Sequence, residues 1–486
     1  MNPSNLVVVY DDRLITNSSV SEIVGIRRYG DIVGRHKSQW SIFLDHLKPR
    51  TAHQVFRLTS DLDLNQLRIY LNSFTSINRI FYVSAVAGFT YDDLLSLYYR
   101  LTFCDFDFID SPDTPLIAFF CNIPKIKSEW SGFWRNNTLD IGKLDDQPAE
   151  LTSTQIRNLS NRSELIAHLA FTTQPREFNH INPTEYSIVK TSHDKKKIKG
   201  EYLFYHLLPM QMKPWVAPTY GYTESMNESC YYMHRYAFTD ASVLWVHNAF
   251  TALSFNVFIQ KVFHFLSVRE KKTANTDMLL QLSDSLFLHK VKTRIESFLA
   301  SEIGRHVNSV ANSLGDHFDI TKLFVRYKLL YEKNRHLFSS RYITIGHGDI
   351  CLSNILYDIH TQQLLLIDPR GALRKRDLWT HPLYDICKLS HSITGNYDYI
   401  NKGLFRVTLD SDIKGKIEFD LPEQFSLISS YNEIMLSRCD FSKKAIDLGV
   451  VSLFLSMLPL HSDNERKVLA FLMNSSYLLD KIELSS

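Results

Sequence analysis

Apolar runs alternate with segments of helical spacing along the first 125 residues. Five short β-rich runs predict strands at residues 5–10, 53–60, 79–85, 106–110 and 115–122. Three segments with apolar residues at helical intervals predict helices at 39–47, 64–74 and 91–101. Strands alternating with helices are typical of a mostly parallel sheet covered by helices. We therefore expect a separate α/β domain over residues 1–145.

The pattern changes after this region. Residues 146–163 are polar, with few large apolar side chains, and predict a linker. Next come strand-like pieces at 164–171, 177–181, 185–192 and 230–236, with a helical pattern over 195–208 ended by Pro209. Helical patterns dominate residues 242–338 and return from about 422. We expect a small β-rich lobe over 164–240 and a large helical lobe over 241–486.

The bulk properties exclude several kinds of protein. The 486 residues are 44% hydrophobic and carry a net charge of only +2, which argues against a nucleic-acid-binding protein. The densest basic stretch, Lys195 to Lys199, is typical of a solvated helix face. The longest apolar stretch, near residue 450, is shorter than a membrane span and contains Pro459, so no membrane span is expected. Six widely spaced cysteines without CxxC and no evident signal peptide favour a cytoplasmic location.

One short stretch has the residues for chemistry. The sequence GHGDICLSNILYD, residues 346–358, places Asn354 five positions after Asp349, and an apolar run ends at Asp368, nineteen positions after Asp349. Phosphoryl transfer from ATP needs a carboxylate to orient the attacking hydroxyl, and hard oxygen ligands to hold Mg²⁺. The spacing therefore predicts Asp349 as catalytic base and Asn354 and Asp368 as magnesium ligands. The alternative is a buried turn whose Asp and Asn cap backbone groups, and we expect His347 to brace the loop.

A kinase also needs a cation for the nucleotide phosphates and an acid to position that cation. Lys190 ends a β-rich run, and Glu201 lies eleven residues later in the following helical pattern. These two residues are expected to form an ion pair, with Lys190 contacting ATP; the lysines of 195–199 are the alternative cations. Met233 to Arg235, ahead of the helices, is the predicted hinge whose backbone meets adenine.

Taken together, these residues resemble the aminoglycoside phosphotransferase and choline kinase superfamily. The fuller run through LLLIDPRG and HPLYDICKLSHSITGNYDYI is most similar to its branch associated with bacterial capsular and surface-polysaccharide synthesis. The resemblance covers about 165–486 and implies an α+β protein-kinase-like bilobal fold, preceded by the separate α/β domain. It also implies that Asp385 supports the catalytic loop from a helix. The chain departs from the pattern in lacking a glycine-rich phosphate loop and in having Arg370 where protein kinases have the Phe of D-F-G, which implies a constitutively assembled enzyme.

The resulting expectation is an ATP- and Mg²⁺-dependent phosphotransferase acting on a hydroxyl of a small molecule, a sugar or polyol unit used for a surface polymer. A choline, ethanolamine or aminoglycoside acceptor is one alternative, and a non-catalytic pseudokinase-type binding protein is another. The preference for ATP over GTP and the oligomeric state stay open. So does the role of the N-terminal domain, where Asp11 and Asp12 follow the first strand and are expected to form a surface turn.

Overall fold

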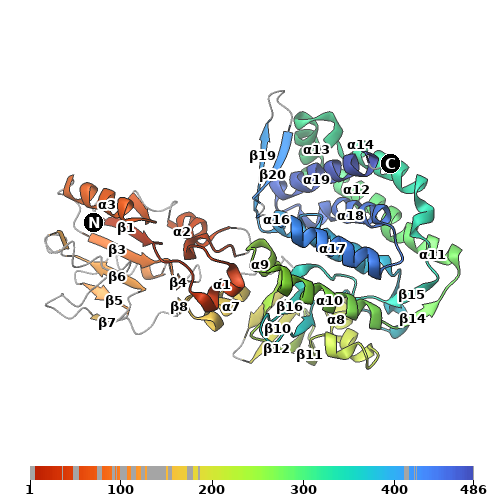
Figure 1. Cartoon of the computed structure of the whole chain (residues 1–486), viewed down its shortest axis with the longest axis horizontal. Helices are drawn as coiled ribbons and strands as arrows, with labels where there is room; N and C mark the ends of the chain where they lie inside the picture. The colour runs from red at the N-terminus through yellow and green to blue at the C-terminus, as the bar shows by residue number, and fades with distance from the viewer. Residues whose placement is uncertain are drawn as a thin grey trace. The chain divides into compact units, whose positions relative to one another are not determined.

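The computed structural model divides the chain into two compact units, Met1–Thr173 and Gln174–Ser486, and each is considered by itself. Figure 1 shows the elements along the whole chain. The structure describes residues 6–34, 37–47, 54–73, 79–89, 94, 96–98, 107–110, 116–121, 126–127, 149–150, 156–171, 179–183, 186–409, 415–420, 422 and 424–484. The predicted helix at 91–101 lies largely outside these residues.

The first unit is built on a six-stranded sheet in the order β2-β1-β3-β6-β5-β7. Its strands are β1 (Leu6–Asp11), β2 (Gln54–Leu58), β3 (Arg79–Ser84), β5 (Phe108–Ile109), β6 (Ile117–Phe120) and β7 (Ala149–Glu150). β1 runs parallel to β2 and β3, and β5 runs parallel to β7, whereas β6 is antiparallel to both β3 and β5. The sheet is therefore mixed rather than mostly parallel, because the short connection from β5 to β6 cannot make a parallel crossover.

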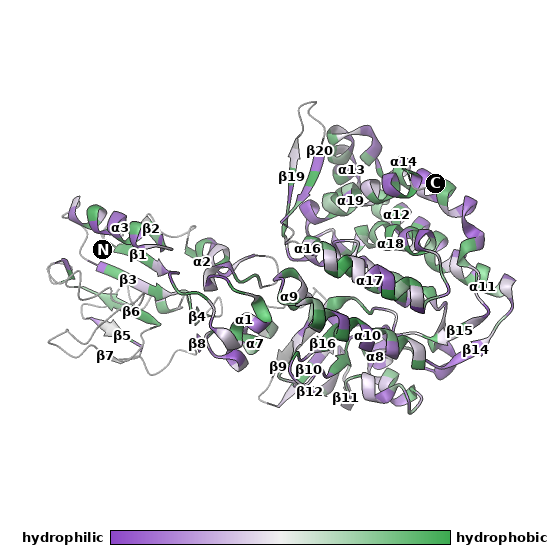
Figure 2. Cartoon of the chain, viewed as in Figure 1, coloured by the Kyte–Doolittle hydropathy of each residue, from purple (hydrophilic) through white to green (hydrophobic). Residues whose placement is uncertain are grey.

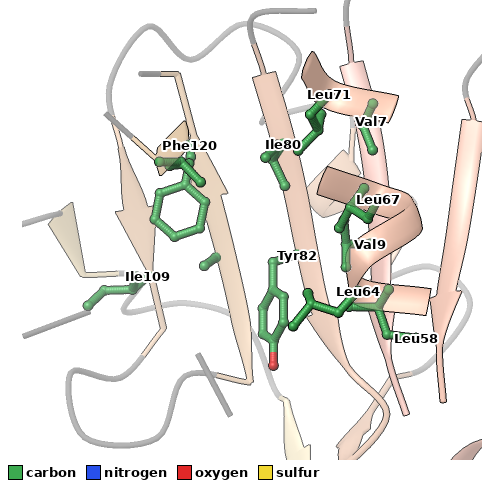
Figure 3. Close-up of a cluster of buried hydrophobic side chains, with 12 residues drawn as sticks. Val7, Val9, Leu58, Leu64, Leu67, Leu71, Ile80, Tyr82, Ile109 and Phe120 are labelled. Carbon is green, nitrogen blue, oxygen red and sulfur yellow. The ribbon is translucent and has the colours of Figure 1, made fainter. Parts of the chain in front are cut away.

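The core of this unit lies between the sheet and helix α3 (Asp61–Ser73). Figure 3 shows Leu64, Leu67 and Leu71 of α3 beside Val9 and Ile80 of the central strands. The three leucines are spaced by three and four residues, so they share one face of the helix. All five side chains are buried, which explains why these apolar periodicities predicted the elements correctly.

The remaining elements of the unit are short. They are α1 (Ser18–Val24), η2 (Tyr29–Asp31), α2 (Gln39–Leu47), β4 (Ala87–Gly88), β8 (Arg157–Asn158) and α7 (Arg162–Phe171). The predicted linker thus contains β7 and β8, which pair with β5 and β4. The strand predicted at 164–171 is wrong, because it is helix α7. The amide oxygen of Asn161 accepts hydrogen bonds from the backbone N–H groups of Ser163 and Glu164, which caps and starts a helix there.

The prediction of a surface turn at Asp11 and Asp12 is also wrong. Both residues are buried. Asp11 pairs with Arg13 at 2.8 Å, and Asp12 pairs with Arg57 and accepts a hydrogen bond from the backbone N–H of Gly30 at 2.8 Å. Asp11 and Asp12 can be buried at the end of β1 because Arg13 and Arg57 neutralise their carboxylates.

The second unit begins with a four-stranded antiparallel sheet in the order β11-β12-β10-β9. Its elements are β9 (Asn179–Pro183), β10 (Ser187–Ser192), α8 (Lys195–Leu207), η3 (Lys213–Trp215), β11 (Thr219–Glu224) and β12 (Ser229–His234). Helix α8 packs on β11 and β12, with Ile198 of the helix buried against Tyr231 of the sheet. The strands and helix predicted at 177–236 are confirmed in kind and in position.

A helical part with small sheets follows. Its helices are α9 (Ala241–Val246), α10 (Ala252–Val268), α11 (Thr276–Ser283), the π-helix η4 (Asp284–His289), α12 (Lys290–Ala300), α13 (Glu302–Leu314), η5 (Asp316–Phe318), α14 (Ile320–Lys333), η6 (Arg335–Phe338), η7 (Leu352–Asn354), η8 (Lys375–Leu378), α15 (Leu383–Ile393), α16 (Tyr397–Asn401), α17 (Phe425–Arg438), α18 (Lys443–Met457), η9 (Leu458–His461) and α19 (Glu465–Leu484). Its strands are β13 (Thr239–Asp240), β14 (Lys271–Thr273), β15 (Tyr342–Ile345), β16 (Ile355–Tyr357), β17 (Leu364–Leu366), β18 (Trp379–Thr380), β19 (Phe405–Leu409) and β20 (Gly415–Phe419). Helices such as α10 and α17 carry both hydrophobic and hydrophilic stretches (Figure 2). This mixed content, with a sheet ahead of the helices, fits an α+β kinase-like fold.

One helical run of the described chain, Lys443–His461, is apolar and long enough to cross a membrane by length and composition alone. However, 78% of its most apolar window is buried inside the structure. Its helix α18 packs against α12, α15 and α19. Burial among other helices accounts for a helix that is apolar on all sides.

Candidate functional site

The loop after β15 carries the motif that the sequence singled out. Asp385, on α15, accepts hydrogen bonds from the backbone N–H groups of His347 at 3.0 Å and Gly348 at 2.8 Å. Gly348 has φ +83°, a left-handed conformation that favours glycine. The Arg269 guanidinium lies 2.8 Å from the same Asp385 carboxylate, and both groups are buried. Asp385 therefore fixes the course of the loop, as the resemblance implied, whereas Arg269 had no signal in the sequence.

The side chain of His347, a residue of this loop, is fully buried. Its ring meets the ring of Phe204 edge-on, with centroids 5.8 Å apart. Burial lowers the pKa of His347, against the smaller raising effects of Asp385 and Asp349. The imidazole is therefore neutral at pH 7, and its position fits the predicted role of a brace for the loop.

Asn354 and Asp368 lie at the same end of the hairpin formed by β16 and β17. The backbone N–H of Ile367 donates to the carbonyl oxygen of Asn354 at 3.0 Å, which places Asp368 one residue beyond this pairing. The side-chain amide of Asn354 donates to the backbone oxygen of Asp349 at 2.9 Å. The Asn354 side chain thus closes the turn from Asp349 to Asn354, and the backbone of Asn354 links this turn to the end of the hairpin.

Lys190 connects the sheet to this hairpin. Its Nζ atom lies 2.7 Å from Oε2 of Glu201 and 2.9 Å from Oδ1 of Asp368. The hydroxyl of Tyr231 donates to Glu201 Oε2 at 3.2 Å. The predicted Lys190–Glu201 ion pair is therefore present, and the structure brings Asp368 to the same ammonium group.

One buried ammonium serves two carboxylates in this group. Burial alone would lower the pKa of Lys190, but Asp368, Tyr231 and Glu201 raise it well above its ordinary value. Burial alone would raise the pKa of Asp368, but the charge and hydrogen bond of Lys190 hold it below its ordinary value. Burial raises the pKa of Glu201, and Lys190 offsets this effect only in part. Lys190 and Asp368 are thus charged at pH 7.

A glycine at position 371 lets α8 approach the segment that follows Asp368. A side chain at Gly371, which has φ +62°, would place its Cβ atom 2.2 Å from the backbone oxygen of Gly200. Gly200 belongs to α8 and precedes Glu201 directly. The close backbone contact therefore holds Glu201 next to Asp368. Gly200 had no predicted role, although a glycine inside a helical pattern can mark such a contact.

Sequence reasoning also missed Lys388. Its Nζ atom lies 2.9 Å from Oδ1 of Asp349, and the lysine side chain is only 14% exposed. Lys388 is on α15, three residues after Asp385, so both residues share the helix face that meets the loop from His347 to Asn354. That spacing was the available signal.

The predicted hinge residues lie at the end of β12. Met233 is buried against Ile198 and Tyr231. The backbone N–H of Arg235 donates to the carbonyl oxygen of Tyr186 at 2.9 Å. The chain passes from the sheet to α9 just after these residues. Their contact with adenine stays a prediction.

The predicted magnesium ligands are one carboxylate and one amide. In the ranges that the structure describes, no group of three or more His, Cys, Asp or Glu residues could hold a metal ion. The donor set nonetheless suits Mg²⁺, which takes hard oxygen atoms and obtains several of them from phosphate and water. Only one oxygen of Asp368 is engaged, by Lys190; within the described chain the other has no hydrogen-bond partner, and the side chain is 35% exposed.

No protein-family model and no curated protein match the chain. The matching solved structures include three small-molecule kinases. Aminoglycoside phosphotransferase APH(4)-Ia with ADP and hygromycin B is 9% identical over 63% of this chain and 94% of its own, with a TM-score of 0.37. A protein assigned as a fructosamine-3-kinase from Haemophilus somnus is 14% identical over 64% and 89%, also at 0.37. Spectinomycin phosphotransferase APH(9)-Ia with ADP and spectinomycin is 12% identical over 64% and 91%, at 0.34.

Proposed function

We propose that the chain is an ATP- and Mg²⁺-dependent phosphotransferase that phosphorylates a hydroxyl group of a small molecule. The observation that carries the proposal is the contact of Lys190 with both Glu201 and Asp368, at the hairpin end that also bears Asn354. A buried lysine held by an acid, facing a second acid and an amide, has the groups that nucleotide phosphates and their metal require.

Each residue has a distinct role in this proposal. Lys190 contacts the α- and β-phosphates of ATP, and Glu201 holds Lys190 in place. The oxygens of Asn354 and Asp368 hold Mg²⁺, which when bound neutralises charge on the transferred phosphate. Asp349 accepts a hydrogen bond from the acceptor hydroxyl and orients it. Its side chain is 37% exposed, so an acceptor can reach it.

A sugar or polyol unit used in surface-polysaccharide synthesis is the proposed acceptor. This part rests on the resemblance of the motifs from 346 to 400 to the polysaccharide-associated branch, since one fold supports many substrates. The hinge at Met233 and Arg235 is proposed to meet adenine through backbone atoms, and a cytoplasmic location is proposed with it.

The test is an ADP-release assay of the full chain with Mg²⁺, ATP and a panel of sugars and polyols. Acceptor-dependent ADP release is expected in the wild type and is expected to be absent in Asp349→Asn. A wild type that binds Mg-ATP but releases no ADP with any acceptor would support a non-catalytic binding protein instead. Equal turnover in Asp349→Asn would sink the proposed role of Asp349.

A further inference from the structure

We call Lys290, Arg294 and Arg370 the basic cluster, because the charges of Arg294 and Arg370 both act on Lys290 and the Arg370 side chain lies against Gly348. Lys290 and Arg294 lie one turn apart on α12, so they share one face of that helix. Arg370 follows Asp368 by two residues. From the sequence, Arg370 stood out only as a departure from the protein-kinase motif, and Lys290 and Arg294 had no predicted role.

Two contacts tie the basic cluster to Asp349. The Nζ atom of Lys290 lies 2.8 Å from the hydroxyl of Tyr384, and Tyr384 is one turn before Lys388, the partner of Asp349, on α15. The backbone N–H of Arg370 donates to the carbonyl oxygen of His347 at 2.9 Å, inside the catalytic loop. The basic cluster therefore borders the place where the acceptor hydroxyl must lie.

The positive charge of the basic cluster is not balanced. In the part of the chain that the structure describes, none of its three residues has a carboxylate within ion-pair distance. The Arg294 guanidinium instead donates to the backbone oxygen of Ser456 at 2.7 Å. Burial lowers the pKa of Lys290 and of Arg294, and the charge of Arg370 lowers both further, while Tyr384 partly opposes these effects. Lys290 and Arg294 are partly buried, whereas Arg370 is exposed. Partly buried cations are normally paired, so Lys290 and Arg294 favour a negatively charged ligand that the exposed Arg370 can also reach.

The backbone ahead of Lys290 gives independent support. Residues Asp284–His289 form a π-helix between α11 and α12. Single π-helical turns within α-helices are rare and often occur at functional sites, because the extra residue changes the direction of the side chains that follow. The first residue after this turn is Lys290.

We propose that the basic cluster binds an anionic group, a phosphate or a carboxylate, carried by the phosphoryl acceptor. The acceptor is then an anionic hydroxyl compound, such as a sugar phosphate or a uronic acid, and neither a neutral sugar nor a cationic amine. This inference rests on the proposed function, since it assigns the acceptor of that reaction. In the reaction, the bond from the γ-phosphorus to the ADP oxygen breaks, the acceptor oxygen bonds to that phosphorus, and the hydroxyl proton passes to Asp349.

The first experiment measures binding without turnover. The full chain is titrated calorimetrically with glucose and glucose 6-phosphate, with glycerol and glycerol 3-phosphate, and with glucuronate. We expect the charged compounds to bind at least about tenfold more tightly than their neutral counterparts, on the scale of a charge-assisted hydrogen bond. Equal binding of charged and neutral compounds, or no binding of either, would overturn the inference. If the phosphates bind and glucuronate does not, the anionic group is a phosphate. If only glucuronate binds, the group is a carboxylate. Either result supports the inference.

The second experiment uses variants of Arg294 and Arg370, so that the contact between Lys290 and Tyr384 is kept. Arg294→Gln combined with Arg370→Gln is expected to weaken binding of the charged probe by about tenfold or more, with ATP binding unchanged. Lys292→Gln is the matched control, because Lys292 lies on α12 with a 58% exposed side chain and only a 3.8 Å pairing with Glu296. Equal weakening in the control, or weaker ATP binding in the double variant, would contradict an acceptor site.

The two proposals fail in different ways. If charged probes bind at the basic cluster but no acceptor produces ADP, the phosphotransferase proposal falls and the anion site stands. If neutral acceptors are phosphorylated and the double variant turns them over normally, the phosphotransferase proposal stands and the anion site falls.

Discussion

Lys388 and Asp349 form an ion pair of 2.9 Å between Nζ and Oδ1, across two segments separated by the hairpin of β16 and β17. Burial alone would lower the pKa of Lys388, but Asp349 and Tyr384 raise it, so the ammonium stays charged at neutral pH. The pair fixes the direction of the Asp349 carboxylate. We infer that Lys388 is a positioning residue for the proposed base.

Replacing Lys388 by Met should reduce kcat by up to about a hundredfold, because a misdirected catalytic group loses rate on this scale. The KM for ATP should change little, since Lys190 and Asp368 are untouched. Steady-state kinetics separate the two constants, and Lys388→Arg should restore part of kcat. A variant with normal kcat would show that the ion pair has no catalytic consequence.

Asp368→Asn should lower turnover by about a thousandfold or more, the scale seen when a charge that stabilises phosphoryl transfer is lost. The substitution removes one negative ligand oxygen and keeps the shape of the side chain. The measurement is ADP release as a function of Mg²⁺ concentration, with circular dichroism to check folding. Retained activity at ordinary Mg²⁺ would show that Asp368 is not a metal ligand.

Lys190→Met should destabilise the protein as well as raise its requirement for ATP. The substitution leaves the buried Glu201 with only the more distant cation Lys197, at 3.8 Å, and breaking a buried ion pair costs up to about 3 to 5 kcal/mol. Urea unfolding measures the loss. Adding Glu201→Gln to Lys190→Met should recover part of the stability but none of the activity, and failure to recover any would mean that the pair is not coupled.

The Gly200–Gly371 contact predicts opposite effects for two alanine substitutions. Gly371→Ala should lower stability and turnover, because the residue has φ +62° and its Cβ would collide with a backbone oxygen at 2.2 Å. Gly200→Ala is the matched comparison, because its Cβ would lie 3.4 Å from Ala372 and alanine gains up to about 1 kcal/mol of helix propensity. Thermal unfolding of both variants tests this contrast, and equal effects would contradict it.

Asp398 makes stability depend on pH. The residue, on α16, is fully buried, and burial raises its pKa to about 7. An unfolded Asp ionises near pH 4, so between pH 4 and 7 the folded state binds more protons than the unfolded state, and stability falls as pH rises. The loss is complete above pH 7 and is on the order of 4 kcal/mol at most.

Asp398→Asn should therefore remove this pH dependence and stabilise the protein at pH 8 more than at pH 5. Urea unfolding at the two pH values measures the change. The exposed Asp463 gives the control substitution Asp463→Asn, which should leave the pH profile unaltered. An unchanged profile in Asp398→Asn would show that another group sets it.

The sequence predicted the second unit well because its elements carry their own signals. The apolar strand ending at Lys190, the helix from Lys195 and the turn from Asp349 to Asn354 each combine local periodicity with a fixed spacing of polar residues. A long-range partner such as Arg269 could not be predicted in the same way, since packing rather than spacing brings it to Asp385. For Lys388 the signal was its three-residue spacing from Asp385 on one helix, which the sequence analysis did not use.

The errors in the first unit have a similar origin. Segment 164–171 has apolar residues that suit a strand, and only the cap at Asn161 shows that it is helical. The burial of Asp12 depends on its ion pair with Arg57 of the neighbouring strand, and no local sequence pattern predicts this contact. Whether neighbouring strands are parallel or antiparallel depends on the lengths of the connections between them, which the apolar pattern does not predict.

The contact between Gly200 and Gly371 also bears on how far helix α8 can move. The backbone of helix α8 at Gly200 contacts the backbone at Gly371 directly, with no side chain between them. Helix α8 therefore cannot move closer to this segment. Rotating α8 outward would pull Glu201 away from Lys190 and break this close backbone contact. We therefore expect helix α8 to keep one position against the segment that follows Asp368, whether or not a nucleotide is bound.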